Sequence, residues 1–257
     1  LINYSEICYA GYDYGLKGEF SGLWIATDNA ILLNTYIHHC YIGTYLYNTN
    51  NVTIMGCTIS NCSYESIEIC YSMNSRIVNC TLKQVPSIYV YRSNDTIIRE
   101  CHIETLDSGY PLIIHAVWID SSNNSVVLNN VFIGGGLVFL HSHNNIVENN
   151  TVNDKPIVYL EDTHDYTILN AGQVIIINSS DIIITNVSTF TTSYDIQIYE
   201  SQNIVIIYSM IHGQARVGHS KNIYISESLI NESLMIEYSQ EVTIRKCEIP
   251  MHIYGIK

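Results

Sequence analysis

Positively charged residues are scarce in this sequence of 257 residues. It contains 11 Lys and Arg against 24 Asp and Glu, so the formal net charge is −13 with neutral His. Binding to a nucleic-acid backbone depends on clustered cations that release counterions, which argues against a nucleic-acid partner. Only 14% of the residues are charged while 47% are hydrophobic, which excludes a disordered chain.

Proline is also scarce, and long apolar runs and cysteine motifs are missing. With four prolines there is no Pro-rich linker, and we predict a single domain over residues 1–257. No apolar run reaches the roughly 18–20 residues of a transmembrane span. The eight cysteines form no C-x-x-C pair and no zinc-finger spacing, which argues against a cysteine-based metal framework.

Short segments of similar pattern recur at intervals of about twenty residues. Examples are NNVTIMGCTI (residues 50–59), MNSRIVNCTL (73–82), NDTIIRECHI (94–103), NIVIIYSMI (203–211) and NIYISESLI (222–230). Each copy holds two short strands of alternating, mostly β-branched apolar residues around a Ser/Asn/Asp turn. Such a unit buries its apolar face only by stacking on its neighbours. The sequence therefore predicts an all-β fold, a parallel β-solenoid of about eleven coils.

This repeat resembles the right-handed parallel β-helix of the pectate-lyase superfamily, and in particular the NosD-like or CASH-type repeats of archaeal and bacterial surface proteins. The resemblance extends from about Gly22 to Lys257 and implies a right-handed parallel β-helix. The lyases of that superfamily use a basic residue beside calcium-binding acids, and its hydrolases use a cluster of acids on one wall. Neither set matches this sequence residue by residue, so no catalytic residue is transferred.

Two sets of recurring positions have structural interpretations. Asn and Asp at the turns tolerate a left-handed backbone, and their stacked side chains form hydrogen-bonded ladders. The turn positions are Asn51, Asn74, Asp95, Asn124, Asp181, Asn203 and Asn222. Cys57, Cys80 and Cys101 recur at another position, where we expect them to fill the interior. Cys40 and Cys62 share a third position, where a disulfide is the alternative to two free thiols.

The repeat is irregular in three places. Residues 104–111 lengthen one step, so we expect a loop that bulges from the wall. The step from Ala171 to Val187 is short (187 − 171 = 16), which predicts a tightened coil. Residues 252–257 lack a polar cap, and we expect another segment or subunit to cover that end of the solenoid.

One column of aromatic residues is expected on the outer surface, between the two inward residues of the first strand. The column reads Trp24, Tyr45, Glu68, Tyr89, Trp118, Phe139, Tyr159, Ile176, Gln197 and Arg216. A continuous row of large exposed apolar side chains marks a contact surface. We interpret its aromatic members as a ligand or assembly surface, for a neighbouring subunit, a covering loop or stacked sugar rings, with simple packing along the wall as the alternative.

Acidic residues and histidines recur on three successive coils. Aligning Ile119, Leu140 and Leu160 as inward residues stacks Asp120, His141 and Glu161, with Asp162 in the next column. The side chains there form a hydrogen-bonded turn ladder, hold a divalent metal or supply two carboxylates for glycoside hydrolysis. The catalytic candidates are Asp120, His141, Glu161 and Asp162, and the metal-ligand candidates are His141, His143, Glu161 and His164. We expect no comparable neighbours in register for the other histidines, including His38 and His39.

Ten N-x-S/T sequons indicate a glycosylated exterior, although Asn-rich turns beside Thr-rich strands also create sequons. The glycosylation candidates are Asn3, Asn61, Asn94, Asn123 and Asn231. With an acidic composition and few lysines, these features favour an extracellular or cell-surface protein, with an archaeal cell surface as the preferred setting.

Three functions remain open. The first is a non-catalytic β-helical module of a surface-layer, filament or adhesin-like protein, part of a larger or assembling protein, which associates through the aromatic column and the open solenoid ends. The second is a carbohydrate-binding protein or a polysaccharide lyase or hydrolase. The third is a periplasmic metal-binding protein, as the NosD-like repeats suggest. The expected partners are a second copy or a neighbouring module, with a glycan as a further ligand, and a divalent metal is the only cofactor indicated.

Overall fold

A computed structural model describes residues 1–8, 21–85, 87–105, 115–189 and 194–256. All regular structure in these ranges is β-strand, and the strands build about ten turns of a parallel solenoid. The predicted fold class is therefore confirmed. In the same ranges no helix is long and apolar enough to cross a bilayer. Most of the expected loop at 104–111 lies outside the described residues. The chain forms two compact units, unit 1 (Leu1–Asn150) and unit 2 (Thr151–Lys257).

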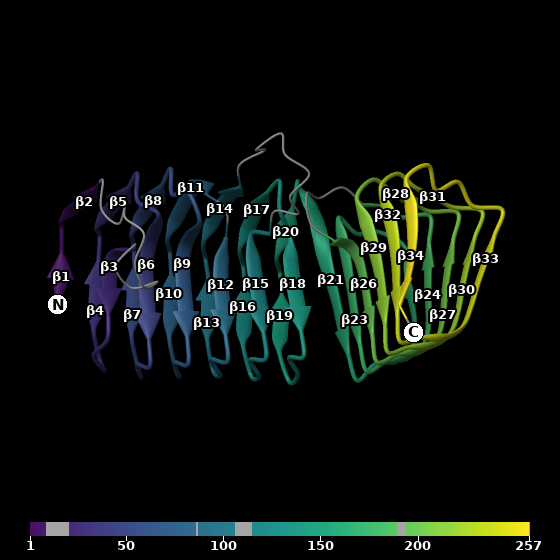
Figure 1. Ribbon diagram of the computed structural model, residues 1–257, viewed down its shortest axis with the longest axis horizontal. Coiled ribbons are helices and arrows are strands. Elements are labelled where there is room, and N and C mark those ends of the chain that lie inside the picture. The colour runs from purple at the N-terminus through teal and green to yellow at the C-terminus, as the bar shows by residue number, and fades with distance from the viewer. Residues whose placement is uncertain (9–20, 86, 106–114, 190–193, 257) are drawn as a thin grey trace. The chain divides into compact units, whose positions relative to one another are not determined.

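Three parallel sheets form the walls of unit 1 (Figure 1). The β1 sheet contains β1 (Ile2–Asn3), β4 (Ile31–Leu33), β7 (Thr53–Met55), β10 (Arg76–Val78), β13 (Ile97–Arg99), β16 (Val126–Leu128) and β19 (Ile146–Glu148). In unit 1 the β2 sheet contains β2 (Glu6–Cys8), β5 (Tyr36–His38), β8 (Thr58–Ser60), β11 (Thr81–Val85), β14 (His102–Thr105) and β17 (Val131–Ile133). The β3 sheet contains β3 (Ser21–Ile25), β6 (Ile42–Tyr47), β9 (Glu65–Cys70), β12 (Ile88–Tyr91), β15 (Val117–Asp120) and β18 (Leu137–Leu140).

The turns of both units use the predicted Asn and Asp positions. Every residue of that column has a positive φ, from 54° at Asn74 and Asn222 to 59° at Asp181, the left-handed region that Asn and Asp tolerate best. The side chains also bond from coil to coil. Asn222 Nδ2 donates to Asn203 Oδ1 at 2.7 Å, and Asn203 Nδ2 donates to Asp181 Oδ1 at 2.9 Å. The interpretation as a structural ladder is confirmed.

Cysteines and amides fill one interior column of unit 1. Cys57, Cys80 and Cys101 are each 2% exposed or less, as expected. The next coils carry Asn130 and Asn150 there, and the Asn130 side-chain oxygen accepts a hydrogen bond from the Cys101 backbone N–H at 2.9 Å. A buried Asn needs such partners, because an unpaired buried amide is costly. The alternative of a Cys40–Cys62 disulfide is wrong, since neither cysteine forms a disulfide.

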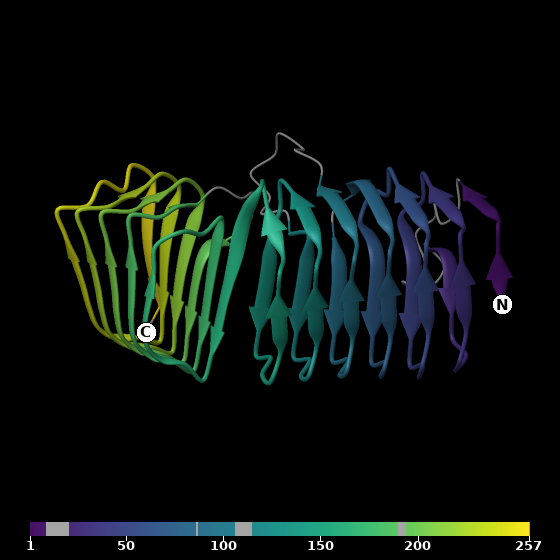
Figure 2. The same cartoon turned by 180° about the vertical axis from the view of Figure 1, so that it is seen from behind.

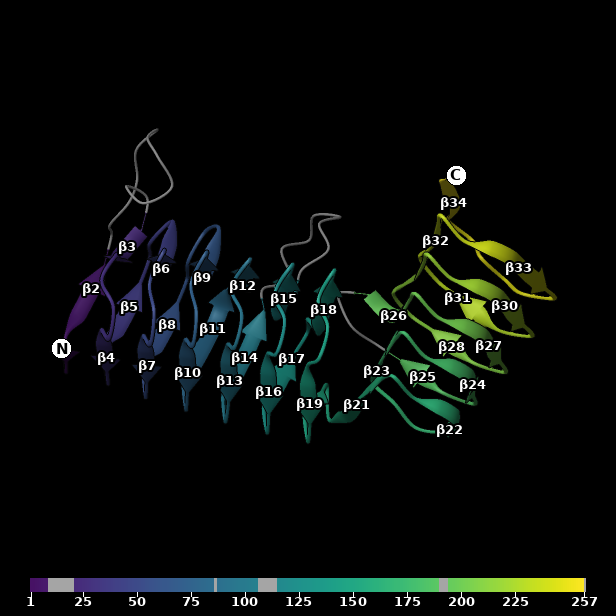
Figure 3. The same cartoon turned by 90° about the horizontal axis from the view of Figure 1, so that it is seen from below.

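Unit 2 repeats the parallel arrangement, with its strands in three sheets (Figure 2). It starts with β20 (Thr151–Val152), which pairs antiparallel with β21 (Lys155–Glu161). The β21 sheet continues through β23 (Gln173–Ile177), β26 (Tyr194–Tyr199), β29 (Gln214–Gly218), β32 (Ser233–Glu237) and β34 (His252–Ile256). The β22 sheet contains β22 (His164–Ile168), β24 (Ser180–Thr185), β27 (Gln202–Ile207), β30 (Lys221–Ser226) and β33 (Gln240–Arg245). The β25 sheet contains β25 (Ser188–Thr189), β28 (Met210–Ile211) and β31 (Leu229–Ile230). Its three strands are labelled in Figure 3.

The first coil of unit 2 is short, as the spacing predicts. Ile157 pairs with Gln173, a step of 173 − 157 = 16 residues, whereas the next step from Val174 to Ile196 is 196 − 174 = 22 residues. The described β25 sheet begins one coil later, with Ser188 and Thr189. The tightened coil therefore omits one strand of the repeat.

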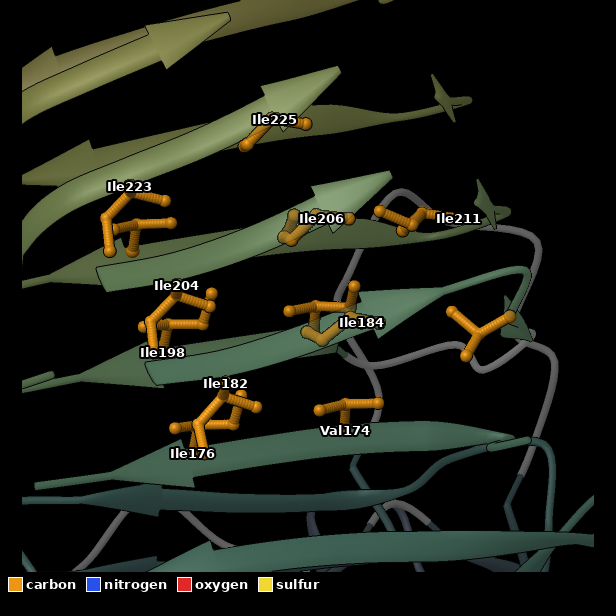
Figure 4. Close-up of a cluster of buried hydrophobic side chains, with 14 of the residues drawn as sticks. Val174, Ile176, Ile182, Ile184, Ile198, Ile204, Ile206, Ile211, Ile223 and Ile225 are labelled. Carbon is orange, nitrogen blue, oxygen red and sulfur yellow. The ribbon is translucent and has the colours of Figure 1, made fainter. Parts of the chain in front are cut away.

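Stacked isoleucines form the interior of unit 2. Ile176 and Ile198 of the β21 sheet face Ile182 and Ile204 of the β22 sheet (Figure 4), and all four are completely buried. Strands bring equivalent residues about 4.8 Å apart, so each isoleucine packs on the one in the coil below. Burial of each such side chain contributes roughly 1.5–3 kcal/mol. These ladders supply the cohesion between successive coils.

Candidate functional site

The predicted aromatic column forms on the β3 sheet of unit 1, but only in part. Trp24, Tyr45, Glu68, Tyr89 and Trp118 occupy directly paired positions on five successive strands. The sixth position belongs to Val138, because Ile119 pairs with Phe139 and Trp118 with Val138.

Two of the assigned positions are wrong by one residue. Phe139 is an inward residue and is 2% exposed. In unit 2 Tyr159 pairs with Ile175, which continues to Gln197, Arg216, Met235 and Tyr254, while Ile176 points inward.

The burial of this column also differs from expectation. Trp24 is 53% exposed, but Tyr45 is 6% exposed and Glu68 is completely buried. Tyr89 and Trp118 are half-buried. The column is therefore not a row of solvated aromatic rings.

Six aromatic residues of unit 1, three of them from this column, form an unbroken series of ring contacts. We call it the aromatic strip, and it comprises Tyr45, Tyr47, Tyr71, Tyr91, Tyr89 and Trp118. The ring centroids are 5.9, 5.8, 5.6, 6.0 and 5.0 Å apart in that order. These separations lie in the range of favourable aromatic pairs. Tyr47 and Tyr71 are 42% and 45% exposed, so the strip presents its rings to solvent there.

Sequence reasoning missed the second column of the strip. Tyr47 and Tyr91 lie two residues after Tyr45 and Tyr89 and therefore on the same side of the strand. Tyr71 follows β9 in a left-handed turn, with φ 53°. The motifs YLY (residues 45–47) and YVY (89–91) in the sequence indicate this second column of tyrosines.

Charged and polar groups border the aromatic strip. The Arg92 guanidinium lies 5.1 Å from the Tyr91 ring centroid and 5.9 Å from that of Tyr71, within the range of cation–π contacts. Asp120 pairs with Tyr91 across neighbouring strands. Burial, followed by the charge of Asp120, raises the pKa of Tyr89 above its ordinary value. Tyr89 is therefore a neutral hydrogen-bonding phenol at physiological pH.

The acid and histidine residues do not stack as predicted. Asp120 pairs with Leu140, one residue before His141. The two side chains are still neighbours, with Asp120 Oδ1 3.7 Å from His141 Nδ1, and Ser121 Oγ donates to Asp120 Oδ1 at 2.9 Å. The backbone N–H of His143 donates to the side-chain oxygen of Asn123. This arrangement is a polar turn region beside the aromatic strip.

The remaining candidates belong to unit 2. Glu161 accepts a hydrogen bond from Tyr159 Oη at 2.7 Å, and Asp162 accepts one from Asn178 Nδ2. His164 Nδ1 lies 3.1 Å from Ser180 Oγ. Of these contacts, Asp162–Asn178 and His164–Ser180 join successive coils, whereas Tyr159 and Glu161 lie on the same strand.

A polar groove of about 400 Å³ lies over the turns between the β21 and β22 sheets. Its lining includes Asp162 and His164, and also Glu200, His219 and Lys221, which sequence reasoning did not select. Its charges are solvated, and its walls are turns of successive coils. The groove offers hydrogen bonds but no enclosed apolar surface.

One group of potential metal ligands stands out among the described residues. Glu6, Cys8 and His38 place one ligand atom each within 4.8 Å of one another. The expectation that His38 has no comparable neighbours is therefore wrong. No other group of three His, Cys, Asp or Glu side chains in the described ranges is this close, and neither His141 nor His143 belongs to one.

The sequons occupy different environments. Asn3 is exposed, whereas Asn61, Asn94, Asn123 and Asn231 are half-buried. The side-chain oxygen of Asn94 accepts the backbone N–H of Asn123 at 2.8 Å, so this amide supports a turn.

Two protein families match parts of the chain. Residues 16–105 match the right-handed beta helix region family, and residues 87–174 match the periplasmic copper-binding protein (NosD) family. The chain therefore contains right-handed β-helix and NosD-like repeat regions, as the repeat predicted. The described residues of the NosD-like region contain no close group of three potential metal ligands, so a copper site does not follow from this match. No curated protein matches the chain.

Several solved structures are similar to the chain. A mutant tailspike protein of E. coli bacteriophage HK620 in complex with a pentasaccharide has a TM-score of 0.53 at 14% identity, covering 95% of this chain and 57% of its own. The surface adhesin PfbA of Streptococcus pneumoniae has a TM-score of 0.39 at 14% identity, covering 88% and 63%. An exopolygalacturonase from Thermotoga maritima has a TM-score of 0.36 at 15% identity, covering 83% and 54%. The chain spans less than two thirds of the length of each, and the likeness to the tailspike protein shows the fold alone.

Proposed function

We propose that the chain is a non-catalytic β-helical module of an extracellular or cell-surface protein, and that its aromatic strip binds an extended glycan. The observation that carries this proposal is the unbroken series of ring contacts from Tyr45 to Trp118. The strip crosses successive coils, so it runs along the repeat as a linear ligand does.

The chemistry of the strip suits a sugar better than a protein partner. Pyranose rings stack on aromatic faces, while their hydroxyls bond to charged and polar groups such as Arg92 and Asp120 at the border. A stable protein interface needs about 800 Å² per partner with few charges at its centre. Here only Tyr47 and Tyr71 of the strip are strongly exposed. The tailspike relative, which was solved with a pentasaccharide, supports a glycan as the ligand class.

Catalysis is not proposed. Glycoside hydrolysis needs two carboxylates that flank a substrate. Glu68 and Asp120 lie on the outer side of the β3 sheet, but Glu68 is completely buried. Its Oε1 accepts a hydrogen bond from Cys70 Sγ at 3.4 Å. A carboxylate buried in this way does not reach a sugar on the strip.

Tryptophan fluorescence tests the proposal directly. The sequence has two tryptophans, so Trp24→Phe leaves Trp118 as the only reporter, inside the strip. We expect neutral or acidic oligosaccharides from a surface-polysaccharide panel to change its emission, and Tyr71→Ala to weaken binding about 2–12-fold, the equivalent of 0.5–1.5 kcal/mol.

Tyr208→Ala is the matched control for this experiment. Tyr208 also lies in a left-handed turn, with φ 52°, and is 57% exposed, but it belongs to unit 2. The proposal fails if no glycan of the panel changes the Trp118 emission, or if the two tyrosine variants weaken binding equally.

Self-association is a second candidate function, which the exposed apolar side chains at β34 favour. Met251, directly before β34, and Ile253 and Tyr254 on this strand are 58%, 54% and 48% exposed. Contiguous exposed apolar side chains favour contact with a neighbouring module or a second copy. Light scattering over a range of concentrations tests this candidate, and Ile253→Lys is expected to hold the protein monomeric.

A further inference from the structure

The β2 sheet brings His38 beside Glu6 and Cys8, which precede it by about thirty residues in the sequence. The three side chains differ in their chemistry. In the register of β2 and β5, Glu6 pairs with Tyr36, Ile7 with Ile37, and Cys8 with His38. Ile37 is fully buried, so the residues on either side of Ile7 and Ile37 lie on the outer side of the sheet. The result is a surface with a carboxylate, a thiol and an imidazole.

The His38 ring is fixed in its orientation. It stacks on Tyr36 with ring centroids 4.3 Å apart and an angle of 23°. Its Nε2 lies 2.9 Å from Glu6 Oε1, and its Nδ1 lies 2.7 Å from His39 Nδ1. His38 is 8% exposed, so the ring has little freedom to rotate away.

The His38–His39 contact has two tautomers, and one of them makes Nε2 available to a cation. A hydrogen bond between the two Nδ1 atoms contains one proton. When His38 donates that proton to His39, the lone pair of His38 is on Nε2, the atom that faces Glu6. Metal-bound histidines usually donate their second ring N–H in this way, which fixes the tautomer and raises the basicity of the ligand.

We propose that Glu6, Cys8 and His38 bind a late first-row divalent transition-metal ion of the Zn²⁺ type, with His39 as the positioning residue. Zn²⁺ prefers nitrogen, sulfur and carboxylate ligands at about 2.0–2.3 Å, which places ligand atoms of a tetrahedral site roughly 3.3–3.8 Å apart. The three ligand atoms lie within 4.8 Å of one another. The Glu6 side chain is 64% exposed and Cys8 is also exposed, so both rotate into place at little cost.

Three protein ligands leave the fourth position of a tetrahedral ion for water or another ligand. The site lies on β2 and β5, outside residues 87–174 that match the NosD family. It is also on a different sheet from the aromatic strip, so its test is independent of glycan binding.

Metal binding by the full chain tests the proposal. Isothermal titration with Zn²⁺ is expected to give one ion per chain, and Co²⁺ is expected to produce a thiolate-to-metal charge-transfer band that reports on Cys8. Cys8→Ser and His38→Ala are expected to lose stoichiometric binding, and Cys8→Ser also the band. His39→Ala is expected to weaken binding 10–100-fold while the band remains.

Cys247→Ser and His102→Ala are the matched controls. Cys247, like Cys8, is a thiol that is not fully buried. His102 is a half-buried histidine on β14, in the same sheet as His38. Both variants are expected to bind like the natural chain. The site is disproved if the natural chain binds no Zn²⁺, or if Cys8→Ser and His38→Ala, with unchanged circular dichroism, bind as well as the controls.

Discussion

Both units stack parallel coils, but different side chains fill one column of their interiors. Unit 1 places thiols and amides in an interior column, from Cys57 to Asn150, and bonds them to the backbone of the preceding coil. The corresponding column of unit 2 holds the smaller buried residues Val187, Ser209 and Ser228, beside isoleucine ladders such as Ile182, Ile204 and Ile223. Both units retain the same serine ladder at one turn, in which each Ser Oγ accepts the backbone N–H of the preceding coil. The repeat therefore fixes the turns, while the interior filling varies.

The outer faces differ in the same way. Unit 1 carries the aromatic strip with solvated rings at Tyr47 and Tyr71. The corresponding column of unit 2 continues through Ile175 and Gln197, which are 1% and 3% exposed, to Arg216. A column of this kind stabilises the wall, whereas the strip of unit 1 offers surface to a ligand.

The largest expected difference between the units is in the cost of truncating an interior side chain. Ile204→Ala in unit 2 is expected to cost about 2–5 kcal/mol, because it removes a fully buried side chain from the middle of a ladder. Cys80→Ala in unit 1 removes a single sulfur atom and is expected to cost about 1 kcal/mol. Urea unfolding measures both. Equal costs would show that the thiol column packs as tightly as the isoleucines.

An ion pair provides the next test, on the outer face of unit 2. Arg216 Nε and Nη2 donate to Glu237 Oε2 at 2.9 and 2.7 Å, between the rings of Tyr194 and Tyr199. Arg216→Met is expected to cost about 1.5–3 kcal/mol, because Glu237 loses its charged donor.

The double variant Arg216→Met with Glu237→Leu distinguishes pairing from packing. It is expected to recover most of the loss, since well-packed apolar residues replace such pairs at little cost. If the double variant is as unstable as the single one, the cation–π contacts with the tyrosines stabilise this face more than the ion pair does.

Alkaline pH is expected to weaken unit 1 through its buried thiols. Burial, followed by the nearby Cys40, raises the pKa of Cys62 from 9.0 to about 12. The folded state therefore holds this proton above pH 9 while the unfolded state releases it, so stability is intact below pH 9 and falls as the pH rises towards 12. The slope is about 1.4 kcal/mol per pH unit for this group. Unfolding of the natural chain and of Cys62→Ala between pH 8 and 11 measures it, and a constant difference between the two would contradict the assignment.

The repeat made the fold predictable, but the register of individual strands was less so. Alternation is clear in VWID (residues 117–120), and the Trp118 position was predicted correctly. In LVFL (residues 137–140) and VIII (174–177) every position is apolar, so hydrophobicity does not say which residues point inward. The two errors, Phe139 and Ile176, fall in these runs. The register there is set by turn hydrogen bonds, such as Ser121 N–H to the Leu140 carbonyl.

The group of Glu6, Cys8 and His38 was unpredictable for a related reason. The resemblance to the repeat begins at about Gly22, and β2 lies before that residue. Its three members are brought together only by the pairing of β2 with β5. The adjacent histidines at 38 and 39 were the visible signal, but their partners depended on a register that the sequence did not define.

The smallest expected effect concerns the turns that both units share. Asn74 in unit 1 and Asn203 in unit 2 have φ values of 54° and 56°, where a residue with a side chain other than Asn or Asp is strained by about 1–2 kcal/mol. Asn→Ala at either position is expected to cost about 1 kcal/mol, whereas Asn→Gly is expected to cost less, because glycine adopts this φ freely. Asn203 also loses its bonds to Asp181 and Asn222, so the glycine variant should be less well tolerated there than at Asn74. Thermal unfolding of the four variants separates backbone strain from the side-chain ladder, and equal melting temperatures for the two glycine variants would show that the ladder adds nothing.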